Sequence, residues 1–149
     1  MKGENLIKNY TSRVPPERSI SHIENALVAH GAKNILKNYD SGRLTGFAFI
    51  VDVGGKDVPF KIPARVERVE KRLREAVKRL RNGTLSRITD QAEKTAWKIL
   101  ADWVDIQMAL VDLDQVEIME VFLPYAYDAV KKQTLFDKVK DGSLKLLKE

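Results

Sequence analysis

The chain has 149 residues, of which 44% are hydrophobic and 32% charged, a balance typical of a globular rather than a disordered protein. The 26 Lys and Arg residues against 21 Asp and Glu give a modest formal net charge of +5, and the lack of cysteine excludes disulfides, thiolate catalysis and cysteine zinc sites. No apolar stretch approaches the roughly 20 residues that span a bilayer, and no apolar leader opens the chain. We therefore expect a soluble, cytoplasmic protein without a membrane partner.

The N-terminal segment has no helical spacing of apolar residues. Residues 5–12 are expected to form a short strand or an extended arm, within an arm that covers residues 1–18. The two prolines at 15 and 16 end any regular element there, because proline lacks the backbone N–H and biases the preceding residue towards extended geometry.

A first helix is expected at about 20–30. Ser19 or Ser21 suits its N-cap, and Gly31 suits the position after its end. Its apolar residues recur at helical spacing: Ile20, Ile23, Leu27 and Val28.

The next stretch changes to the alternating pattern of strands. We expect a three-stranded antiparallel meander at 33–39, 43–53 and 56–62. Its turns contain Asp40-Ser41-Gly42 and Gly54-Gly55, which are residues that favour tight turns. Pro59 predicts that the third strand lies at an edge of the sheet.

Residues 64–83 predict an amphipathic helix that ends at Asn82-Gly83 and docks by one narrow face. That apolar stripe consists of Val66, Val69, Leu73, Val77 and Leu80. Off the stripe lie eight basic residues, Arg65, Arg68, Lys71, Arg72, Arg74, Lys78, Arg79 and Arg81. Together with three glutamates they sum to +5, which equals the net charge of the whole chain.

Three more helical segments follow. A long helix at about 90–111, capped by Thr89 or Asp90, is apolar over most of its surface, which is typical of a core or interface helix. A shorter helix at 115–123 is halted by Pro124. A last helix of about two turns begins at the Thr134-x-x-Asp137 pattern and stops at Gly142.

These elements predict an α+β fold in the order α-β-β-β-α-α-α-α, with the meander packed against helices and a helix-rich C-terminal half. We expect a single domain over residues 1–149. It would comprise the arm at 1–18, a helix plus β-meander at 19–63 and a helical part at 64–149.

The basic helix is the strongest functional candidate. Clustered Lys and Arg can neutralise phosphates and release counterions. The alternative is a solvated helix face, because Glu67–Lys71 and Glu75–Arg79 have the spacing of i,i+4 ion pairs. With no aromatic residue among the cations, binding would address backbone phosphates with little sequence specificity.

A second candidate is an aromatic surface for a host protein or for a second copy of the chain. Trp97 and Trp103 are about 240° apart around one helix. One is therefore expected in the core and the other as an interface anchor. The predicted interface residues are Trp97, Trp103, Phe122, Tyr125 and Tyr127.

Catalysis is the weakest reading. His22 and His30 lie about 12 Å apart along one helix and cannot share a metal. Asp102 and Asp105 could hold a divalent metal or perform acid–base chemistry, or could simply face solvent or the basic helix. The Gly-Gly-Lys at 54–56 lacks P-loop spacing. We expect no catalytic residue, no metal ligand and no cofactor.

Four segments have a familiar pattern: "KNYTSRVPPERSISHIENALVAHGA", "FKIPARVE", "AEKTAWKILADWVDIQMALV" and "EVFLPYA...QTLFD". Together they resemble a family of small proteins of unknown function from phage and prophage genomes. The resemblance implies a small accessory protein of a phage or mobile element in the cytoplasm of a bacterial host. Together with the charge of the basic helix, it leads us to expect a non-enzymatic protein that contacts nucleic acid or a nucleoprotein through that helix. The alternative is a protein-binding inhibitor of a host defence or nuclease complex, acting through the aromatic patch.

The helix–meander–helix order is also similar to a double-stranded-RNA-binding domain, which reads A-form shape through the start of its second helix. Here Glu67 and Glu70 stand among the cations at that point, and the expected lysine motif is missing. The likeness is one of topology alone.

Overall fold

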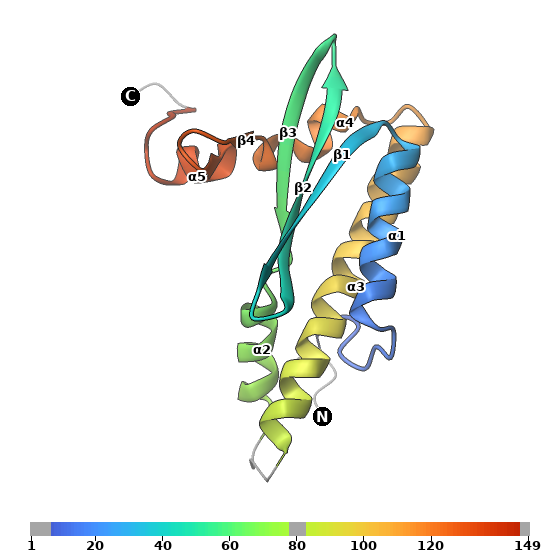
Figure 1. Ribbon diagram of the computed structural model, residues 1–149, viewed down its shortest axis with the longest axis vertical. Coiled ribbons are helices and arrows are strands. Elements are labelled where there is room, and N and C mark those ends of the chain that lie inside the picture. Colours follow the sequence, from blue (N-terminus) through green and yellow to red (C-terminus); the bar gives the residue numbers. More distant parts are fainter. Residues whose placement is uncertain (1–6, 78–82, 147–149) are drawn as a thin grey trace. The chain divides into compact units, whose positions relative to one another are not determined.

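Figure 1 shows the computed structural model, which describes residues 7–77 and 83–146. The elements in chain order are α1 (Pro16–Ala29), β1 (Ala32–Asp40), β2 (Arg43–Val53), β3 (Lys56–Pro63), α2 (Val66–Glu75), α3 (Thr84–Asp112), α4 (Ile118–Phe122), the 3-10 turn η2 (Leu123–Tyr125), β4 (Tyr127–Asp128), β5 (Gln133–Thr134) and α5 (Leu135–Lys140). The predicted α+β class and element order are confirmed. The small hairpin of β4 and β5 was not predicted.

The chain divides into two compact units. The first combines Met1–Ala26 with Ala64–Ile106, and the second combines Leu27–Pro63 with Gln107–Glu149. Helices α1 and α3 each contribute residues to both units. The expected single domain stays a prediction.

In the first unit, α1 begins at Pro16, earlier than predicted. Proline suits the first helical position because its fixed φ is already helical and its missing N–H would have no partner there. The prolines thus start the helix rather than only ending the segment before it. The predicted caps are wrong: Ser19 lies inside the helix and is buried.

The described part of the predicted 5–12 strand is a turn instead. Asn9 has a φ of 60°, which asparagine tolerates better than most residues. The backbone N–H groups of Tyr10 and Ser12 donate to the carbonyls of Ile7 and Asn9. The prediction of a strand is therefore wrong for residues 7–12.

Polar side chains fasten this turn to α3. The Thr95 hydroxyl donates to the Asn9 carbonyl at 2.9 Å, and the Gln91 amide donates to the Ser12 carbonyl at 3.0 Å. The Asn9 amide in turn donates to the Asp102 carboxylate at 2.8 Å. Thr95 is fully buried, so its bond to Asn9 satisfies a hydroxyl that would otherwise destabilise the unit.

The boundary between α2 and α3 also differs from the prediction. Helix α2 ends at Glu75 with Ala76 as its C-cap, and α3 begins at Thr84. No residue of α2 is buried, so little tertiary packing supports extension of the helix. Thr89 is not a cap, since it lies inside α3, five residues after the helix begins.

In the second unit, β1, β2 and β3 form the predicted antiparallel meander, with β2 in the centre and β3 at an edge. The strand ends agree with the sequence to within one residue. Gly46 suits its place in β2, because a Cβ there would lie 3.1 Å from the Ile62 carbonyl oxygen of β3 and would push that strand away by a few tenths of an ångström.

An aromatic cluster forms the core of this unit. Phe49 stacks on Phe60 with ring centres 5.5 Å apart, and Phe122 meets Phe49 edge-on at 5.1 Å. These three rings and Phe47 are fully buried. Phe122 thereby anchors the short helix α4 to the sheet.

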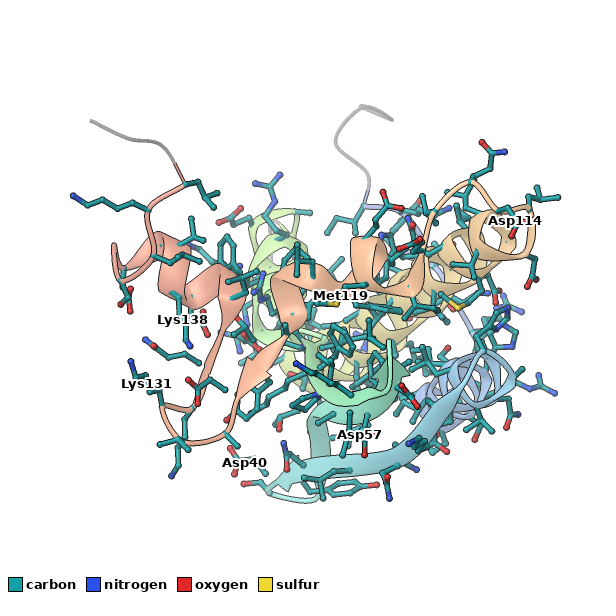
Figure 2. The ribbon with its side chains drawn as sticks, turned by 90° about the horizontal axis from the view of Figure 1, so that it is seen from above. Asp40, Asp57, Asp114, Met119, Lys131 and Lys138 are labelled. Atoms are coloured by element: carbon teal, nitrogen blue, oxygen red, sulfur yellow. The ribbon has the colours of Figure 1, made fainter. Side chains whose placement is uncertain are left out.

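The C-terminal elements are held by local polar contacts. Thr134 and Asp137 form the predicted capping box at the start of α5. The Lys138 ammonium of α5 donates to the Asp128 carboxylate at 2.8 Å, and Figure 2 shows Lys138 directed towards the β4–β5 hairpin. Asp128 also accepts the backbone N–H groups of Val130 and Lys131, which closes the hairpin turn.

Candidate nucleic-acid interface

The predicted basic residues fall into two groups. Arg65, Arg68, Lys71, Arg72 and Arg74 lie on α2 or directly before it. Lys78, Arg79 and Arg81 lie outside the described residues. The part of the basic set that has a structure is therefore the first two and a half turns of the predicted helix.

Two of the five cations are engaged by glutamates of the same helix. Arg74 Nη2 lies 2.8 Å from Glu70 Oε1, and Arg72 Nη1 lies 3.9 Å from Glu75 Oε2. Both arginines are at least half exposed, although the Glu70 side chain is only 21% exposed, so solvent weakens each pair and each contributes little to stability. The Arg72 pair is long enough to leave most of that guanidinium available.

The other three cations have no ion-pair partner among residues 7–77 and 83–146. Arg68 and Lys71 are exposed, while Arg65 is half-buried before the helix. The predicted Glu67–Lys71 pair does not form. At 100° per residue, Arg68, Lys71 and Arg72 occupy an arc of about 100°, and the centre of that arc lies about 140° around the helix from the centre of the apolar stripe.

Helix α2 is oriented on α3 by one polar contact in addition to its half-buried stripe of Val66, Val69 and Leu73. The Thr89 hydroxyl lies 3.0 Å from Oε1 of Glu70, the same oxygen that receives Arg74. Figure 1 shows α2 beside the N-terminal part of α3.

The net charge of the chain is confined to one unit. By sequence, the first unit carries 15 Lys and Arg against 10 Asp and Glu, whereas the second carries 11 of each. The basic helix therefore stands in a basic unit, where its field is reinforced rather than cancelled.

Sequence reasoning passed over one exposed cation in the first turn of α3. Arg87 is exposed, two residues before Thr89, and forms no ion pair within the described part of the chain. It was missed because it falls outside the continuous basic stretch at 64–83. Arg87 lies about 200° around α3 from Thr89, so it faces away from the contact with α2 and is not part of the α2 surface.

The predicted interface aromatics differ in accessibility. Trp97 and Phe122 are fully buried, which agrees with the expectation that one tryptophan belongs to the core. Trp103, Tyr125 and Tyr127 are half-buried. Only these three retain surface for a partner, and the interface role stays a prediction.

The histidines and aspartates of α1 and α3 form separate pairs. His22 Nε2 lies 2.6 Å from Asp105 Oδ1, and His30 Nε2 lies 2.8 Å from Asp112 Oδ1. Asp102 is held by Lys98 at 2.9 Å and by Asn9. Within the described residues, no three His, Asp or Glu side chains come together as metal ligands.

Burial raises the pKa of Asp102, but hydrogen bonds from Lys98 and Asn9 outweigh it and hold the pKa below its ordinary value. The carboxylate is thus ionised and matched, as in a structural contact. No helix in the described parts of the chain has the length and apolar character to cross a membrane.

Comparison with protein families, curated proteins and solved structures finds no match. The resemblance to a phage-associated family therefore stays a prediction.

Proposed function

We propose that this chain is a non-enzymatic nucleic-acid-binding protein that contacts backbone phosphates through α2. The observation that carries the proposal is that the exposed Arg68 and Lys71 pair with no carboxylate among residues 7–77 and 83–146 and lie in the unit that holds the whole net charge. Exposed cations with no competing carboxylate are free to replace the counterions of a phosphate backbone.

The chemistry of the helix favours charge recognition over base recognition. No aromatic side chain lies among the cations, so the helix offers no stacking platform for bases. The contacts would position the partner without reading its sequence. The proposal includes a biological role. The chain would be an accessory protein of a phage or mobile element that acts on a nucleic acid or nucleoprotein in the cytoplasm of a bacterial host.

A second candidate is a protein-binding inhibitor of a host defence or nuclease complex. It is favoured by Trp103, Tyr125 and Tyr127, which keep part of their surface accessible. Binding through such side chains depends on apolar burial, and it would respond much less to salt than phosphate contact does.

Fluorescence anisotropy with labelled duplex and single-stranded oligonucleotides tests the leading proposal. The variant Arg68→Gln/Lys71→Gln removes two unpaired cations of α2. The variant Lys56→Gln/Lys132→Gln removes two exposed cations of the neutral second unit and serves as the charge-matched control.

The proposal expects wild type and control to bind alike and the α2 variant to bind at least about tenfold more weakly at low salt. An equal loss of affinity in both variants would mean that binding depends on the net charge of the chain and not on α2, which would contradict the proposal. Absence of wild-type binding at low salt would remove the proposal and leave the protein-binding candidate.

A further inference from the structure

A surface pocket of about 280 Å³ lies in the first unit, apart from the residues of α2. It is lined by Val14, Arg18, Ser19, His22, Lys98, Ala101 and Asp105. Its walls come from α1, from the segment before α1 and from α3. The volume is near the lower end for ligand pockets, so the pocket suits a small molecule.

Ser19 is the anomaly of this pocket. It is only 2% exposed, and its hydroxyl has no hydrogen-bond partner in the structure as described. The other buried hydroxyl of the unit, Thr95, donates to the Asn9 carbonyl. A buried hydroxyl without a partner destabilises a protein, so a ligand that supplies the partner explains its presence.

The charged side chains around the pocket indicate which charge a ligand would carry. Asp105 is engaged by His22 at 2.6 Å, and Asp102, beside the pocket, is engaged by Lys98 at 2.9 Å. Arg18 makes no ion pair in the described parts of the chain. Among the charged side chains that line the pocket, Arg18 is therefore the one that no described residue engages, and its guanidinium can meet an anionic group.

The donors and the walls select the chemical class. Arg18 offers guanidinium N–H groups, Ser19 a hydroxyl and Lys98 the N–H groups that Asp102 does not use. Val14 and Ala101 provide apolar surface beside them. We propose that this pocket binds a small aliphatic carboxylate, with its carboxylate on Arg18 and its short apolar part against Val14 and Ala101.

The test is an NMR titration of the ¹⁵N-labelled chain with butyrate, with butyramide as the uncharged isostere and inorganic phosphate as the anion without an apolar part, all at constant ionic strength. Saturable shifts with butyrate alone at the amides of Ser19, His22 and Ala101 are expected. Shifts of equal size with butyramide, saturation by phosphate instead, or no saturation at millimolar butyrate would each overturn the proposal.

Two variants and one control complete the test. Arg18→Gln is expected to weaken the binding of butyrate at least about tenfold, because it removes the charged partner of the carboxylate. Arg13→Gln, an exposed cation of the same unit outside the pocket, is expected to leave the affinity unchanged. If both variants weaken butyrate equally, the binding is general electrostatic attraction and the proposal fails.

Ser19→Ala separates a ligand-binding hydroxyl from a structural one. Because the hydroxyl has no partner, its removal is expected to raise the melting temperature of the free protein while weakening butyrate. A lower melting temperature would mean that the hydroxyl is satisfied within the folded chain, which contradicts the proposal. Unchanged butyrate affinity would contradict it as well.

Discussion

The Thr89 hydroxyl of α3 lies 3.0 Å from Oε1 of Glu70, and the same oxygen receives the Arg74 guanidinium at 2.8 Å. One acidic side chain thus joins α2 to α3 and neutralises one cation of α2. Arg68 and Lys71 are left without a carboxylate among the described residues. Among the described cations of α2, Arg74 and, at 3.9 Å, Arg72 are thus paired with glutamates, whereas Arg68 and Lys71 are not.

Glu70→Gln is expected to tighten nucleic-acid binding several-fold at low salt. The amide keeps an oxygen for Thr89 but no longer neutralises Arg74, so one further cation becomes available. Stability should change by less than about 1 kcal/mol, because the Arg74 side of the pair is exposed. Anisotropy titration measures the affinity.

The matched control for that substitution is Glu17→Gln on α1, which makes the same change in net charge away from α2. It should change the affinity less than Glu70→Gln does. If the two variants tighten binding equally, Arg74 is not part of the interface.

Asn9→Gly is expected to lower the free energy of unfolding by about 1–2 kcal/mol at pH 7, because Asp102 loses a hydrogen bond while glycine accepts the positive φ without strain. Urea denaturation at several pH values measures it. A loss below about 0.5 kcal/mol at pH 7 would mean that the Asn9–Asp102 contact is not formed in solution.

The same variant has a defined pH dependence. Folding lowers the pKa of Asp102. Its contribution to stability is therefore fully present at a pH above the ordinary pKa near 3.9, and it is lost as the pH falls through the lowered pKa of the folded state. The difference between wild type and Asn9→Gly should therefore shrink in acid. A difference that is constant down to pH 2 would show that the charge of Asp102 plays no part.

Asp128 is expected to titrate near pH 2. The Lys138 hydrogen bond is the main cause of its lowered pKa, followed by the Lys131 backbone N–H, and together they outweigh desolvation to place it at about 2. Its contribution to stability is present above the ordinary value near 3.9 and disappears as the pH falls through about 2. Carboxyl-carbon NMR reads the midpoint directly. A midpoint near 3.9 would mean that Lys138 is not bound to Asp128.

Phe122→Leu is expected to lower the free energy of unfolding by about 1–2 kcal/mol, because it removes ring contacts with Phe49 and Phe60 from a fully buried site. Phe136→Leu, at a residue that is 46% exposed, should cost less than about 0.5 kcal/mol. Urea denaturation compares the two. Equal costs would contradict the anchoring of α4 by Phe122.

The meander was predictable from local patterns. Val58, Phe60 and Ile62 alternate, and Gly54-Gly55 marks the turn before them, so the strand ends follow from the sequence to within one residue. The β4–β5 hairpin was missed, because two residues per strand are too few to show alternation.

Contacts between distant residues were not predictable. Asn9 and Asp102 are 93 positions apart, and nothing in either local pattern links them. Serine is a residue type that favours helix N-caps, yet α1 begins at Pro16, so Ser19 lies inside the helix and is buried. For the candidate site, sequence located the cations of α2, whereas the pairing that distinguishes Arg74 from Arg68 required the fold.

The most direct test of the central claim is the salt dependence of nucleic-acid binding by wild type and by Arg68→Gln/Lys71→Gln. Each phosphate neutralised on a duplex contributes about 0.9 to the slope of log affinity against log salt. If α2 contacts phosphates through both cations, the variant's slope should be shallower by about 1.8 than that of wild type. An identical slope in the two proteins would contradict phosphate contact by α2.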